Sequence, residues 1–162
     1  MTPTNRLPLI ILILLLILSN AFWACTYFMS IQHRNDALKE GSTTLAIILA
    51  NTGTLLKEAG TKGQDEYLEV AYMLVDHALL VAQTLDKLTG NNDWTHKVVS
   101  AIASLHDLLA STHQGYTISK DKLMKVGDTL EKLSEALKNL DTESIKQYSQ
   151  ELESLLTQAA RL

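Results

Sequence analysis

The sequence predicts an all-α protein: one N-terminal transmembrane helix followed by an antiparallel four- or five-helix bundle. Three observations support this fold class. Residues 7–31 contain no Asp, Glu, Lys or Arg. The rest of the chain repeats apolar residues at helical spacing and has no alternating strand pattern. Both prolines, Pro3 and Pro8, precede or open the apolar segment, so neither interrupts the helices that follow.

The apolar segment, residues 7–31, is long enough to cross a bilayer. As a helix its 25 residues extend roughly 37 Å, and the hydrocarbon core of a bilayer is about 30 Å thick. Trp23, Tyr27 and Phe28 lie near its carboxyl end, and such aromatic side chains are typical of the headgroup level. We therefore expect a signal-anchor helix at 7–31, preceded by a short tail at 1–6.

Two processing alternatives remain open for this segment. Ser19 and Ala21 are small residues at the spacing that signal peptidase prefers, so cleavage after Ala21 is the first. The second is lipidation of the single cysteine, Cys25, which lies where a lipoprotein cysteine would be. Bulky Trp23 departs from the small-residue pattern of a lipobox, and the chain stays apolar well beyond Ala21.

The orientation in the membrane depends on the charges that flank the segment. Arg6 and the α-amino group precede it, and Arg34 and Lys39 follow it among nearby carboxylates. The positive charge is therefore nearly equal on the two sides, and the positive-inside rule does not decide the orientation. The short tail and the trailing aromatics favour an N-in, C-out topology, with the C-terminal domain outside the cytoplasm; the reverse topology would place that domain in the cytoplasm.

Residues 32–162 have the length of one domain, which we predict to be the helical bundle. The formal charge of the chain is −4 and is spread out, without a basic stripe, which argues against nucleic-acid binding. There is no cysteine after Cys25, so this domain can form neither an internal disulfide nor a cysteine-based zinc site. Such a domain fits a bacterial envelope and the cytosol equally well.

Turn residues divide the domain into helices at about 32–59, 65–89, 93–113, 119–139 and 142–161. Gly41 is a weak point: the first helix either runs through it from the membrane or breaks there, with Ser42 capping a new start. Gly60 is expected to end this helix. In the second helix, apolar residues alternate in steps of four and three, as in coiled coils. This predicted seam is Tyr67, Ala71, Leu74, Ala78, Val81, Leu85 and Leu88, widened by Leu68, Val75, Leu79 and Ala82.

Caps and apolar seams predict the last three helices. Asp93, Ser119 and Asp141 are the expected N-caps of the third, fourth and fifth helices. Gly127 is expected to allow the close approach of a neighbouring helix. Without a turn near Asp141, residues 119–161 would form one long helix, and this alternative stays open.

The polar residues of the domain match no catalytic or metal-binding pattern. His106 and His113 would share a helix face but stand roughly 10 Å apart, too far to share one metal ion. Asp76–His77 and His106–Asp107 are neighbours that point about 100° apart on a helix, so we do not expect acid–base couples. Glu-x-x-His, His-Glu-x-x-His and glycine-rich phosphate loops are also missing from the sequence. We therefore expect no enzyme, no cofactor and no metal site.

Tyr116 and Ile118 lie in the predicted connection between the third and fourth helices. If this loop lies at one end of the bundle, the two residues could form an exposed interaction patch. The alternative is that they plug the end of the bundle and have only a packing role.

These features predict a single-pass protein of the cell membrane, with its bundle as an extracytoplasmic protein-interaction or regulatory module of a bacterial envelope. The layout resembles the extracytoplasmic helical domains of bacterial receptors, although their usual second span and signalling part have no counterpart in this chain. This resemblance is architectural and implies no site residues. A small-ligand sensor and a structural homo-oligomeric element are the alternatives. The expected partners are membrane lipid and either an unidentified protein or a second copy, and no nucleic acid.

Overall fold

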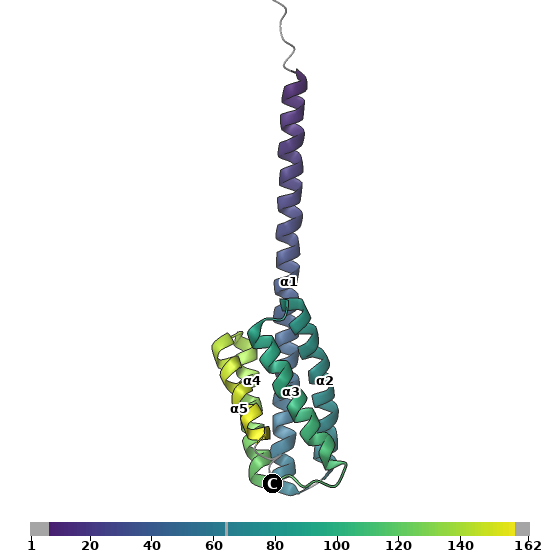
Figure 1. The fold of residues 1–162 in the computed structure, drawn as a ribbon, viewed down its shortest axis with the longest axis vertical. Coiled ribbons are helices and arrows are strands. Elements are labelled where there is room, and N and C mark those ends of the chain that lie inside the picture. Colours follow the sequence, from purple (N-terminus) through teal and green to yellow (C-terminus); the bar gives the residue numbers. More distant parts are fainter. Residues whose placement is uncertain (1–6, 64, 158–162) are drawn as a thin grey trace, which may run out of the picture. The chain divides into compact units, whose positions relative to one another are not determined.

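The computed structural model of the chain is all-helical in the part that it describes, residues 7–63 and 65–157 (Figure 1). Side chains are described from Leu18 onward. The described residues form five helices and no strand, which confirms the all-α prediction for this part of the chain. The helices are α1 (Leu7–Lys62), α2 (Asp65–Thr89), α3 (Asp93–Thr112), α4 (Lys120–Asn139) and α5 (Thr142–Thr157).

The chain divides into two compact units, Met1–Ala37 and Leu38–Leu162. The second unit is the bundle, and it contains the carboxyl part of α1 together with α2–α5. The helix runs through Gly41 without a break, so the predicted alternative of a new helix start there is wrong. Ser42 is buried in the bundle and does not cap a new helix.

The first helix continues past Gly60, so the prediction that this glycine ends it is wrong. Gly60 instead makes room for α4, because a Cβ added there would lie 3.2 Å from the carbonyl oxygen of Lys120. The helix stops at Gly63, whose φ of +68° favours glycine. The Gly63 N–H closes the end by donating to the carbonyl oxygen of Ala59 at 2.9 Å.

The next two helices pack side by side along their length, joined by a tight turn with a φ of +75° at Gly90. The buried stripe of α2 contains Val75 and Ala82, which we predicted only as its flank, in place of Leu74 and Val81, which are half-buried. The buried residues of α2 are Ala71, Val75, Ala78, Ala82 and Leu85.

The predicted cap of α3 at Asp93 is wrong by one residue. Asn92 occupies the N-cap position, and its side chain makes no capping hydrogen bond. The Asp93 carboxylate points to α5 instead, where the ammonium group of Lys146 lies 3.0 Å away.

The caps predicted for the last two helices are confirmed. The side chain of Ser119 accepts a hydrogen bond from the N–H of Lys122 at 3.4 Å. Asp141 accepts one from the N–H of Ser144 at 3.3 Å and one from its hydroxyl at 2.7 Å. Leu140 has a φ of +51° at the end of α4, so a single helix over residues 119–161 is excluded.

The core of the bundle is one apolar cluster to which all five helices contribute. Two of these helices, α1 and α4, come into backbone contact at Gly53 and Gly127. A Cβ added at either glycine would lie 2.7 Å from the carbonyl oxygen of the other. The predicted close approach at Gly127 is therefore confirmed, and its partner is Gly53. The largest fully buried side chains are Leu45, Leu49, Leu56, Val75, Ile102, Leu105, Leu109, Leu130, Leu133, Leu137, Ile145 and Leu152.

Gly127→Ala is expected to lower the free energy of unfolding by about 1 to 3 kcal/mol, because the methyl group overpacks this contact. The loss should appear although alanine has the higher helix propensity. Chemical denaturation of the full chain in detergent, followed by circular dichroism, measures it. Thr54→Ala, at an exposed position of α1, is the control and should change stability by less than about 0.5 kcal/mol. Wild-type stability in Gly127→Ala would contradict the contact.

Acidification is expected to weaken the bundle through Asp93 and Asp141. Lys146 lowers the pKa of Asp93, and the Ser144 hydroxyl lowers that of Asp141. Because each folded-state pKa lies below the unfolded one, the stabilisation is present above the unfolded pKa and is lost as the pH falls through the folded pKa. Melting temperatures should therefore drop between about pH 4 and pH 2. The variant Asp93→Asn/Asp141→Asn should have a lower melting temperature than the wild type at pH 7, and its melting temperature should fall less in acid. If the melting temperatures of the two proteins fall in parallel with pH, this assignment is refuted.

Candidate functional site

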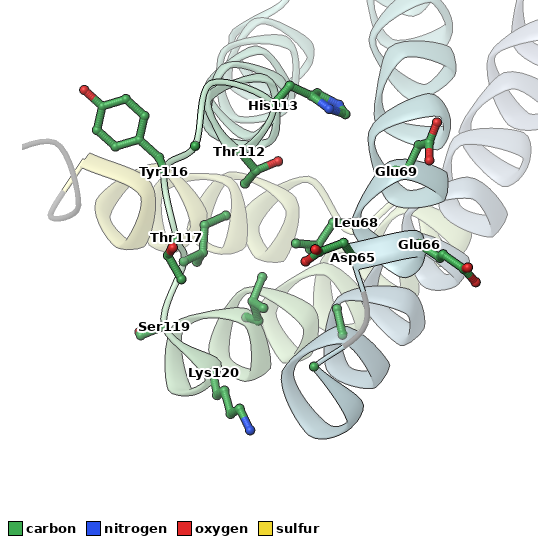
Figure 2. Close-up of a pocket in the computed structure, with 15 residues that line it drawn as sticks. Asp65, Glu66, Leu68, Glu69, Thr112, His113, Tyr116, Thr117, Ser119 and Lys120 are labelled. Carbon is green, nitrogen blue, oxygen red and sulfur yellow. The ribbon is translucent and has the colours of Figure 1, made fainter.

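The end of the bundle where α1 and α3 finish and where α2 and α4 begin contains an open groove of about 730 Å³ (Figure 2). We call it the end groove. Its volume is within the range of sites that bind ligands or short segments of a partner. Its lining residues are Ala59, Gly63, Asp65, Glu66, Leu68, Glu69, Thr112, His113, Gly115, Tyr116, Thr117, Ile118, Ser119, Lys120 and Leu123.

The floor of the end groove is apolar and continuous with the core. Ala59 and Leu123 are buried members of the core cluster. Leu68 and Ile118 are half-buried and pack against it. These side chains are held by four different segments, so the floor exists only when the bundle is closed.

The rim of the end groove is acidic on the α2 side. Asp65, Glu66 and Glu69 are exposed carboxylates, whereas Lys120 is the single Lys or Arg among the lining residues. Asp65 and Glu66 lie in the first turn of α2, where the helix dipole favours negative charge. Glu69 lies beyond that turn, so the dipole does not account for it.

The structure places Tyr116 and Ile118, the two residues of the predicted patch, at this groove in different environments. Ile118 is half-buried against the core, as in the alternative in which it plugs the end of the bundle. The side chain of Tyr116 is 69% exposed, and Figure 2 shows its ring pointing away from the floor. The contact role therefore stays a prediction, and of the two side chains Tyr116 is the more accessible.

A cluster of aromatic, histidine and acidic side chains, which the sequence reasoning missed, lies beside the groove between α2 and α3. The ring centroid of Tyr72 is 4.9 Å from that of His106 and 5.2 Å from that of His113. The Nε2 atom of His106 lies 3.8 Å from an Asp76 oxygen, and its Nδ1 atom lies 3.6 Å from an Asp107 oxygen. His113 also lines the end groove, so the cluster borders it.

This cluster corrects the expectation that adjacent acids and histidines diverge. Nδ1 of His106 lies 3.6 Å from an Asp107 oxygen, although the two residues are neighbours on one helix. An Asp76 oxygen lies 3.8 Å from Nε2 of His106, across the interface between α2 and α3. The antiparallel pairing of α2 with α3 was the signal that could have found this contact. No group of three or more His, Cys, Asp or Glu residues in the described ranges could hold a metal ion.

The described part of the apolar segment is a second candidate surface. Trp23, Tyr27 and Phe28, the predicted membrane-interface residues, are each more than 60% exposed. The side chains are described only from Leu18 onward, so those of residues 7–17 of the predicted span lie outside the described part. Within the described residues, α2 is the helix that is long and apolar enough to cross a membrane, judged by length and composition alone.

Comparison of the chain with protein-family models, with curated proteins and with solved structures gives no match.

The environments of Tyr116 and Ile118 predict opposite outcomes for alanine variants. Ile118→Ala should lower the free energy of unfolding by about 1 to 2 kcal/mol, because it removes apolar contacts with the core. Tyr116→Ala should change it by less than about 0.5 kcal/mol, because the ring is largely in solvent. Denaturation of the full-length variants in detergent measures both. A Tyr116→Ala loss as large as that of Ile118→Ala would show that the tyrosine is a packing residue.

Proposed function

We propose that this chain is a single-pass membrane protein that displays its helical bundle as a protein-interaction module. The observation that carries the proposal is the exposed apolar surface of residues 18–31. Its large apolar side chains are exposed by between 38% and 70%. They are Leu18, Phe22, Trp23, Tyr27, Phe28, Met29 and Ile31.

The distribution of these side chains favours lipid over a protein partner. At 100° per residue, Leu18, Trp23 and Phe28 point in three widely separated directions around the helix axis. A helix that packs against one partner is apolar on one stripe, whereas a helix that is apolar all round is typical of a buried or lipid-embedded segment. The sequence contains no charged residue over residues 7–31, as a lipid-embedded segment requires.

We assign α2 to the bundle and not to the membrane. It buries Ala71, Val75 and Ala78 in the core, and it packs against α3. It also carries Asp76 and His77 at its middle, and ionisable side chains are costly at the centre of a bilayer. The core helix of a water-soluble bundle has the same length and mean hydropathy, so these two properties do not favour a span.

Within the bundle, the end groove lies far from Leu38, the first residue of this unit. Within the bundle, α1 runs from Leu38 to Lys62, which corresponds to roughly 37 Å of helix. The end groove lies at the Lys62 end of this stretch, beside Ala59 and Gly63. An open groove at this end of the bundle suits a module that binds a partner. We place the bundle outside the cytoplasm of a bacterial cell.

Two arginines in the apolar segment should release the chain from the membrane. Leu15→Arg/Leu18→Arg places two charges near the middle of residues 7–31, at a cost of about 2.5 to 3.5 kcal/mol each. The wild-type chain should stay in the membrane pellet after alkaline carbonate extraction, and this variant should move to the supernatant or be lost from the membrane fraction.

Thr54→Arg/Gln83→Arg adds the same charge to exposed positions of the bundle and is the matched control. It should remain in the membrane pellet. Protease treatment of intact cells then tests the orientation, with cleavage of the bundle expected from outside. A wild-type chain that is extracted by carbonate would refute the anchor, and a bundle protected from external protease would refute the proposed orientation.

A further inference from the structure

The charges of the bundle are unevenly divided between its helices. Between Lys62 and Lys87 the chain contains five acidic residues and no Lys or Arg. Between Lys97 and Lys120 it contains one acidic residue and again no Lys or Arg. The α2 helix is therefore acidic, with five carboxylates and one lysine, whereas the five lysines of α4 stand beside four acidic residues.

The end groove opens beside this acidic helix. Its α2 wall presents Asp65, Glu66 and Glu69, and no ion pair joins these carboxylates to another side chain in the described part of the chain. The apolar floor at Leu68 and Ile118 lies directly beside them. A ligand that matches both features must combine positive charge with apolar surface.

We propose that the end groove binds a short basic segment of a partner protein, in which Lys or Arg side chains alternate with apolar ones. Long basic side chains can lay their methylene stems on the floor while their charged ends reach the rim carboxylates. The exposed ring of Tyr116 offers a further contact for a cation. This inference rests on the proposed function, and it adds the chemistry of the partner.

The helix N-termini at the groove do not make it a binding site for an anion in place of a basic segment. Both α2 and α4 begin here, and a free helix N-terminus attracts negative charge. At α2 this partial charge is already met by Asp65 and Glu66 in its first turn. At α4 the Ser119 side chain caps the end and Asp121 lies in the first turn. The negative charges of Glu69 and Asp76, which lie farther along α2, are not compensated by these helix ends. The surface therefore keeps an excess of negative charge.

The test measures peptide binding to the full chain in nanodiscs of zwitterionic lipid, which do not themselves attract a basic peptide. The probe is a fluorescent octapeptide in which Lys alternates with Leu and Ser, and fluorescence anisotropy reports its binding. An octapeptide with Glu in place of Lys is the control ligand. Saturable binding of the Lys peptide alone, weakened by added salt, is expected.

The groove variant Asp65→Asn/Glu66→Gln/Glu69→Gln removes the rim charges. It should bind the Lys peptide about tenfold more weakly than the wild type. The matched variant Glu135→Gln/Glu143→Gln/Glu153→Gln removes the same charge from α4 and α5, away from the groove, and should bind as the wild type does. Melting curves of both variants establish that the bundle is folded.

Three results would overturn the proposal: no saturable binding of the Lys peptide, equal binding of the Glu peptide, or an equal loss in the two charge variants. A fourth is self-association of the wild-type chain that the groove variant abolishes, because the occupant would then be a second copy. Carbonate extraction of the same variants keeps the two proposals apart, since a failed groove leaves the membrane attachment unchanged.

Discussion

The contact between α1 and α4 is the constraint on which the rest of the bundle depends. Gly53 and Gly127 bring the two backbones so close that neither position has room for a Cβ. Gly60, two turns farther along α1, repeats the approach next to Lys120. Between these glycines, the ammonium group of Lys57 pairs with Glu131 and lies 3.5 Å from Asp128. These charges line the edge of the contact, and the Glu131 hydrogen bond raises the pKa of Lys57.

The same contact positions the end groove. Because Gly60 lies against the start of α4, the last turn of α1 and the first turn of α4 are neighbours, and Ala59 and Leu123 both line the groove floor. Gly63 ends α1 in the left-handed conformation, and α2 begins two residues later. The acidic residues in the first turns of α2 therefore lie beside the end of α1. The groove is thus a consequence of where the helices begin and end.

Much of the helical architecture could be predicted from the sequence, because caps, glycines and apolar spacing are local signals. The turns at Gly90, Gly115 and Leu140 follow from such signals, as do the caps at Ser119 and Asp141. Gly60 misled the prediction, because a glycine that serves helix packing and one that ends a helix look alike in sequence. The choice between them depends on α4, which is distant in the chain.

The candidate site was less accessible to sequence reasoning. Tyr116 and Ile118 were identified from their position in a loop, but the acidic wall that faces them comes from α2, about fifty residues earlier. The contact of His106 with Asp76 likewise depends on the register of α2 against α3. Such pairings are set by tertiary packing, and no single stretch of the sequence contains them.

The central claim is that α1 is an integral core helix of the bundle as well as the helix that contains the apolar segment. Hydrogen–deuterium exchange of the full chain in nanodiscs tests it most directly. The account predicts that amides at residues 45–60 of α1 exchange as slowly as those of α4, through global unfolding of the bundle. Rapid exchange of residues 45–60 while α2–α5 stay protected would contradict it.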